Sequence, residues 1–111
     1  MRISVKGRNV PVDDELRKRV DKKFAKVARQ VSELADMEVE LSEERNPSIR
    51  DSQVVELTLH VKGVTLRARE ASEDMVHSLN LAAEDIARQV KRHREKRRKR
   101  REAHRASPRI A

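Results

Sequence analysis

The chain has 111 residues, which is enough for one domain with a small two-layer core. It has no cysteine, which excludes disulfides and thiolate metal sites, and no apolar stretch as long as a signal peptide or a membrane span. The formal net charge is +8, yet Phe24 is the only aromatic residue, which excludes extensive base stacking on aromatic side chains. We therefore expect a cytoplasmic protein that has no membrane partner.

The N-terminal part of the chain predicts a strand, a helix and a second strand. Apolar and polar residues alternate from Ile3 to Lys6, and Gly7 ends this first strand. Pro11 and the acidic residues 13–15 predict a helix start, because the helix dipole favours carboxylates in the first turn. A single helix would then bury one apolar stripe, formed by Leu16, Val20, Phe24, Val27 and Val31. Alternation over residues 37–42 predicts the second strand.

The opposite face of this predicted helix carries a row of four positive charges. They are Lys18, Lys22, Lys26 and Arg29, at spacings of four, four and three residues. Like charges on one stripe repel each other, and a surface helix without a partner normally interleaves acids. We interpret the four residues as a candidate RNA-binding face, and an ordinary solvated face is the alternative.

The second half of the chain predicts a loop at residues 43–51, two strands and a helix. Alternation at 55–62 and 64–69 predicts the strands, with a tight hairpin at Lys62-Gly63. Ser72 is the expected N-cap of the second helix, whose buried stripe is Met75, Leu79, Ala82, Ile86 and Val90. The order predicts an α+β fold, a β-α-β-β-β-α two-layer sandwich with two helices packed on one face of a four-stranded, mainly antiparallel sheet. On the open sheet face, Glu38 and Glu40 are expected to pair with Arg67 or Arg69.

Positive charge is concentrated near the C-terminus. Between Arg88 and Arg105 there are eleven Lys and Arg and two Glu, whereas residues 1–87 hold fifteen Lys and Arg and seventeen acids. The apolar stripe stops at Val90, but helix-favouring residues continue, and Glu95 and Glu102 lie four residues from basic partners. We therefore expect residues 96–111 to form a basic helix extension and tail beyond a folded domain of residues 1–95.

A polyanion, above all nucleic acid, is the expected partner of this basic run. A solvated, disordered tail is the alternative. The candidate RNA-binding residues of this helix are Arg88, Lys91, Arg92, Arg94, Lys96, Arg98 and Lys99.

The residue pattern offers no recognisable catalytic chemistry. The four histidines have no carboxylate or thiol framework around them that would suit a metal. With Gly7 and Gly63 as the only glycines, there is no phosphate-cradling loop, and Ser72 lacks the glycines of a nucleophile elbow. We expect no metal, no cofactor, no small-molecule substrate and no enzymatic activity.

Several short segments together carry a family resemblance. They are Gly7-Arg8-Asn9, Leu66-Arg67-Ala68-Arg69-Glu70, Ser72-Glu73-Asp74-Met75, Leu81-Ala82 and Arg88-Gln89-Val90-Lys91. Over about residues 1–95 the chain resembles the hibernation-promoting factor family, also called the ribosome-associated inhibitor or protein Y family. Two positions depart from the family pattern: Val76 stands where an aromatic residue is usual, and Asn80 stands where Asp is frequent.

The resemblance implies a fold that binds the small ribosomal subunit and its rRNA in the mRNA and tRNA channel, and that blocks translation under stress. A basic wedge without base-stacking groups suits a cleft walled by phosphates. Two alternatives stay open. One is a general double-stranded-RNA-binding module, a type of domain that lacks the first strand predicted here, and the other is an interaction domain whose basic tail only tunes solubility or partner contact. Long family members add a C-terminal dimerisation domain that we expect to be absent here, and Ala106-Ser107-Pro108 is interpreted as the start of a linker.

Overall fold

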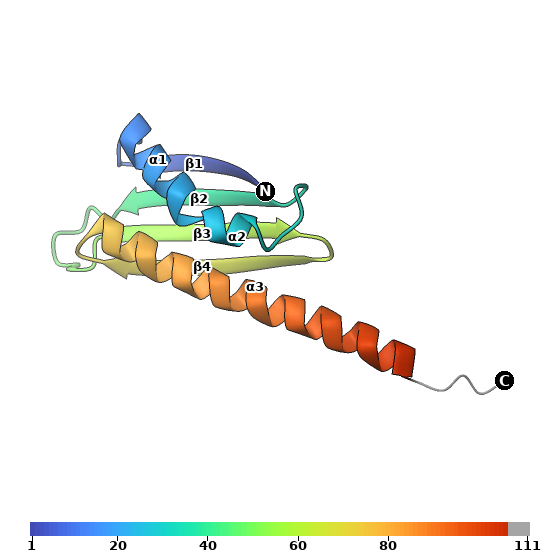
Figure 1. Ribbon diagram of the computed structural model, residues 1–111. Helices are drawn as coiled ribbons and strands as arrows, with labels where there is room; N and C mark the ends of the chain where they lie inside the picture. The colour runs from blue at the N-terminus through green and yellow to red at the C-terminus, as the bar shows by residue number, and fades with distance from the viewer. Residues whose placement is uncertain (107–111) are drawn as a thin grey trace.

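The computed structural model describes residues 1–106, so the predicted tail and linker at 107–111 lie outside the described residues. One face of a four-stranded sheet is covered by helices (Figure 1). In chain order the elements are β1 (Arg2–Arg8), α1 (Asp14–Lys23), α2 (Ala25–Ala28), β2 (Asp36–Glu43), β3 (Gln53–Val61), β4 (Val64–Ser72) and α3 (Met75–Ala106). The predicted α+β sandwich is confirmed.

The strands lie in the order β1-β2-β3-β4. β1 and β2 are parallel, because α1 and α2 carry the chain back across the sheet between them, and the other two pairs are antiparallel. One row of partners across the sheet is Val5, Val39, Leu57 and Ala68, all on the face under the helices. The register therefore places the apolar residues of all four strands in one layer.

The core lies between this layer and the helices. α1 and α2 contribute Val20 and Val27, with Phe24 at their junction, and α3 contributes Ile86 and Val90, all of them buried. These residues belong to the two predicted apolar stripes. Of the other stripe members, Leu79 and Ala82 are buried, and Leu16, Val31 and Met75 are half-buried. Their burial holds both helical segments against the same side of the sheet.

The first helical segment is not the single helix that the periodicity predicts. Asp13 caps its start, where its Oδ1 accepts a 2.7 Å hydrogen bond from the Leu16 amide, but α1 ends at Lys23 and α2 begins at Ala25. The residue between them, Phe24, has φ −98° and ψ 5°, away from helical values, and its side chain is fully buried. The interruption thus coincides with the one aromatic side chain of the core.

The expected N-cap of α3 is also wrong by two residues. Ser72 is the last residue of β4, and the cap is Asp74, whose Oδ2 accepts a 3.2 Å hydrogen bond from the His77 amide. The Ser72 hydroxyl instead lies 2.6 Å from the Ser78 hydroxyl, which donates to the Gln53 carbonyl at 2.7 Å. The serine is therefore used to attach the start of α3 to β3 and β4.

On the open sheet face the expected charge pairs form with other partners. Glu38 lies 3.6 Å from His60, and Glu40 lies 3.9 Å from Arg8. Arg69 lies 3.2 Å from Glu56. Because β3 separates β2 from β4, neither Arg67 nor Arg69 can be a cross-strand neighbour of Glu38 or Glu40.

The predicted hairpin is confirmed. Lys62 and Gly63 form its two-residue loop, and Gly63 has φ +81°, a left-handed value that glycine adopts without steric cost. None of the helices within residues 1–106 combines the length and the apolar character needed to cross a bilayer.

Candidate nucleic-acid interface

The helix α3 is much longer than the sheet that it covers. Its 32 residues span about 48 Å, and among residues 75–105 the last buried one is Val90. The C-terminal end of the helix projects past the end of the sheet (Figure 1). We call residues 91–106 the α3 overhang. Its side chains are exposed from residue 91 to residue 105, apart from the half-buried His93, so the basic run continues a helix whose first half is packed on the core.

The predicted cations of the first helical segment are exposed but divided between elements. Lys18 and Lys22 lie on α1, Lys26 lies on α2, and Arg29 follows it. Within residues 1–106, no ion pair neutralises any of the four. Their charge is therefore available to a ligand, although the break at Phe24 means that they do not share one continuous helical stripe.

The predicted cations of α3 are mostly free of carboxylate partners as well. Arg88 lies 3.9 Å from Asp85, and Arg98 lies 3.8 Å from Glu102. Arg88, Arg98 and Glu102 are exposed and Asp85 is half-buried. Such solvent-accessible pairs between neighbouring turns contribute little and do not neutralise a side chain durably. The other expected helix pairs, from Glu95 to Lys91 or Lys99, are not formed.

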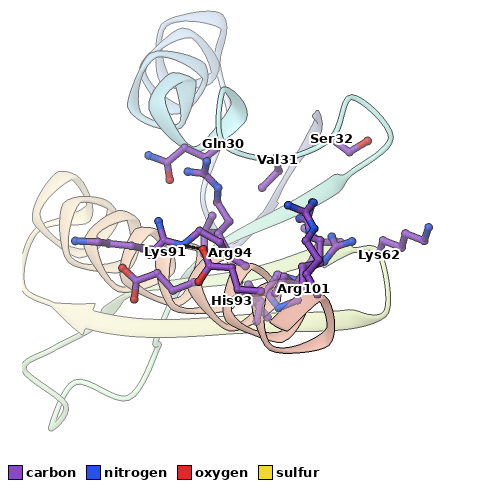
Figure 2. Close-up of a pocket in the computed structure, with 16 residues that line it drawn as sticks. Gln30, Val31, Ser32, Lys62, Lys91, His93, Arg94 and Arg101 are labelled. Atoms are coloured by element: carbon purple, nitrogen blue, oxygen red, sulfur yellow. Dashed lines mark ion pairs between the residues drawn. The ribbon is translucent and has the colours of Figure 1, made fainter. Parts of the chain in front are cut away.

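A basic groove of about 640 Å³ lies where the overhang leaves the sheet (Figure 2). Its walls come from the turn at residues 30–32, the end of the β3–β4 hairpin and α3. Figure 2 shows Gln30, Val31 and Ser32 across from the helix, with Lys62 at the hairpin end. Besides Lys62, six cations line the groove, all from α3: Lys91, Arg94, Arg97, Arg98, Arg101 and Arg105. Two carboxylates, Glu95 and Glu102, oppose them.

The inner end of the groove is apolar. Val31, Val61 and Leu66 are half-buried there, and Val90 is buried among the residues that line it. The His93 Nε2 atom is buried in the same region and has no hydrogen-bond partner within residues 1–106. The groove thus joins an apolar floor, formed by Val31, Val61, Leu66 and Val90, to strongly positive walls.

The groove contains three of the sequence-predicted residues, Lys91, Arg94 and Arg98. It does not contain the other predicted residues of α3, which are Arg88, Arg92, Lys96 and Lys99, nor the cations of α1 and α2.

Sequence reasoning missed Lys62, Arg97, Arg101 and Arg105. A signal for three of them was present, because the buried stripe of α3 continues beyond Val90 through His93, Arg97, Arg101 and Arg105 in steps of three or four residues. A helical face that packs on a sheet keeps its direction when the sheet ends. No local pattern identifies Lys62, which comes from the distant hairpin.

This arrangement is suited to binding phosphates. Arginine predominates among the groove cations, and its guanidinium fork matches phosphate oxygens in a bidentate manner. Among the residues that the structure describes, no group of three or more His, Asp or Glu side chains is placed to hold a metal ion. The chemistry that these side chains offer is anion recognition.

Comparisons with known proteins agree with this picture. A family model described as "Sigma 54 modulation protein / S30EA ribosomal protein" matches residues 3–98. A "Ribosome hibernation promotion factor" of Picosynechococcus is 31% identical over 97 residues, covering 86% of this chain and 50% of that protein. The "Ribosome hibernation promoting factor" of Azotobacter vinelandii is 30% identical over 96 residues, covering 86% and 85%. That of Salmonella typhimurium is 31% identical, covering 86% and 96%. The chain therefore spans half the length of the Picosynechococcus relative and most of the other two.

Solved structures show the same fold. The N-terminal domain of Protein Y from Thermus thermophilus matches with a TM-score of 0.71 and 26% identity, over 84% of this chain and 99% of that one. A ribosomal subunit interface protein from Coxiella burnetii matches with a TM-score of 0.72 at 18% identity, over 86% and 99%, and supports the fold alone. The resemblance drawn from the short sequence motifs is confirmed.

Proposed function

Because the chain belongs to the sigma 54 modulation protein and S30EA ribosomal protein family, we propose that it is a ribosome hibernation factor that binds the small ribosomal subunit and blocks translation under stress. The observation that carries this proposal is the family match over residues 3–98. That range includes α1, α2 and the first part of the α3 overhang, and relatives matched over nearly the same length have the hibernation name. Ribosomes are then the partner, and the cytoplasm is where it works.

The proposed mechanism is occupancy of the mRNA and tRNA channel. The cations of α1 and α2 and those of α3 all belong to the helical layer that covers one face of the sheet (Figure 1). The other face carries charges of both signs that are largely paired, such as Glu56 with Arg69. The helical layer is therefore the more positive side, and it would face the rRNA phosphates. Each cation that neutralises a phosphate releases a counterion, which drives binding.

To block a channel in this way, the protein must bind in the right place, and no covalent bond has to be made or broken. A folded wedge, held by several phosphate contacts, excludes mRNA and tRNA as long as it stays bound. The residues that we assign to this contact are exposed cations on α1, on and directly after α2, and on α3. They are Lys18, Lys22, Lys26, Arg29, Arg88, Lys91, Arg92, Arg94, Lys96, Arg98 and Lys99.

The proposal is tested by sedimentation of the chain with intact ribosomes and separated subunits at moderate salt, set against binding to a free RNA duplex. We expect co-sedimentation with small subunits, and loss of that binding when the subunits carry mRNA and tRNA beforehand. Equal affinity for the free duplex would instead identify a general double-stranded-RNA-binding module. Failure to bind either ligand would leave the basic residues with a role in solubility only.

A further inference from the structure

We propose that the basic groove holds an unpaired RNA strand, with its phosphates along the α3 overhang and a base on the apolar floor. The inference rests on the proposed function in one respect: the ribosome, as the proposed partner, supplies the RNA strand. It goes further because it assigns the groove to single-stranded RNA. The other cations of the helical layer would contact rRNA phosphates only. The groove walls, the floor and the chemistry of the two RNA forms each support this assignment.

The cations on the groove side of α3 form a regular row. Lys91, Arg94, Arg98, Arg101 and Arg105 follow one another at spacings of three or four residues, so a cation occurs on this face about once per helical turn. The row extends over about 21 Å, and Lys62 faces it from the hairpin. An RNA strand carries one negative charge per nucleotide and can meet such a row repeatedly.

The apolar floor discriminates between the forms of RNA. A duplex exposes phosphates and sugars and keeps its bases stacked inside, so it has no apolar surface to place on Val31, Val61 and Leu66. An unpaired nucleotide presents the face of its base. Half-buried aliphatic side chains at the bottom of a positive groove therefore suit an unpaired strand and leave a duplex in contact with the walls alone.

Beside the apolar floor, His93 has a buried ring nitrogen that lacks a hydrogen-bond partner within residues 1–106. This atom is Nε2, and a buried polar atom without a partner costs stability. The edge of a base or a ribose hydroxyl that enters the groove can satisfy this atom after a small rotation of the imidazole. An acidic peptide is the competing occupant, since carboxylates also suit arginine, but it does not present a flat apolar face with a polar edge.

The unusual composition of the chain permits a direct test by NMR. Phe24 is the only Phe, Tyr or Trp of the chain and is fully buried, and His93 contributes the one protein ring among the residues that line the groove. Ring-current shifts of the groove methyls that persist in a His93→Gln variant must therefore come from RNA bases. The full chain, with labelled Val and Leu methyl groups, is titrated with a short oligoadenylate and with an RNA duplex of the same length. We expect upfield shifts of the Val31, Val61 and Leu66 methyls with the single strand alone. Unmoved floor methyls at saturation, or equal shifts with the duplex, would overturn the proposal.

Two double variants remove the same charge from different sides of one helix. Arg94→Gln with Arg101→Gln removes two positive charges from the groove wall. Arg92→Gln with Lys99→Gln removes two positive charges from residues that do not line the groove. We expect the first variant to lose about tenfold in affinity for the oligoadenylate, because bidentate arginine contacts are lost, and to lose the floor shifts. The second is expected to keep the floor shifts despite a smaller loss in affinity. The same response from both variants would contradict a role of the groove.

A polyglutamate peptide is the third ligand of the titration. Tighter binding of this peptide than of the oligoadenylate would assign the groove to an acidic protein segment and would overturn the RNA proposal. Sedimentation with ribosomes separates this inference from the proposed function. Ribosome binding with unmoved floor methyls would contradict only the groove assignment, and shifted methyls without ribosome binding would support the groove while contradicting the proposed function.

Discussion

The side chain of Gln89 on α3 donates a 2.7 Å hydrogen bond from Nε2 to the main-chain carbonyl of Arg67 on β4. The same Nε2 lies 3.3 Å from Asp85 Oδ1 on the preceding turn of the helix. This link lies one residue before Val90, the last buried one among residues 75–105 of α3, and therefore just before the overhang begins. It attaches the helix to an edge strand at the point that sets the direction of the overhang, and it occupies a carbonyl that an edge strand would otherwise expose.

Replacing Gln89 by Ala is expected to lower the free energy of unfolding by about 1 kcal/mol, the usual net contribution of such a hydrogen bond. Gln89→Glu is expected to cost more, because its carboxylate cannot donate to the carbonyl and repels Asp85. Urea unfolding of the three proteins measures both changes. An Ala variant as stable as the parent would show that the Gln89 contact does not hold the helix.

Charge reversal on α3 tests the contact with rRNA. Arg88→Glu with Arg92→Glu should weaken ribosome binding and lower the dependence of log affinity on log salt by about 0.7–0.9 for each lost phosphate contact. Both side chains are exposed, so the free energy of unfolding should change by no more than about 0.5 kcal/mol. Sedimentation over a series of salt concentrations gives the slope.

The matched control for this charge reversal lies on the open sheet face. Lys6→Glu with Arg67→Glu reverses the same charge at two exposed positions that have no ion pair within residues 1–106. This control should leave most of the ribosome affinity intact. Equal losses from both double variants would mean that overall charge, and not the helical layer, determines binding.

Truncation of the buried aromatic residue should have the opposite effect. Phe24 is fully buried, so Phe24→Ala should cost about 3–5 kcal/mol of unfolding free energy through a core cavity. Molecules that remain folded should keep the salt dependence of ribosome binding, because no cation is lost. Leu34→Ala, at a side chain that is 90% exposed, is the control and should change stability by less than about 0.5 kcal/mol. A similar loss at both positions would contradict the assigned core.

Inhibition of translation should be stoichiometric with ribosomes, since the proposed mechanism is occupancy. In a cell-free system, activity should fall in proportion to the ratio of protein to ribosomes and should return when high salt dissociates the protein. Intact rRNA after recovery is the second measurement. Lasting inactivation of many ribosomes by one molecule would contradict the mechanism and would point to catalysis.

Much of the fold is determined by local patterns in the sequence. Alternation of apolar and polar residues identifies the strands, because side chains of a strand point to opposite faces, and it selects Val39, Leu57 and Ala68 for the core. Steps of three and four residues identify the helices and their buried residues up to Val90. The position of the basic run on a helix anchored in the core follows from the same periodicity.

Other features were decided by the tertiary structure alone, because they depend on residues far apart in the chain. The interruption at Phe24 lies where the sequence has no Gly or Pro to mark it, and the partner of Glu38 follows from β3 lying between β2 and β4. The groove depends on this most strongly, since Val31, Lys62 and Arg97 are near one another only after α3 has passed the end of the hairpin. Periodicity describes neighbours along one element, and a site built from three elements exists only once packing has placed them side by side.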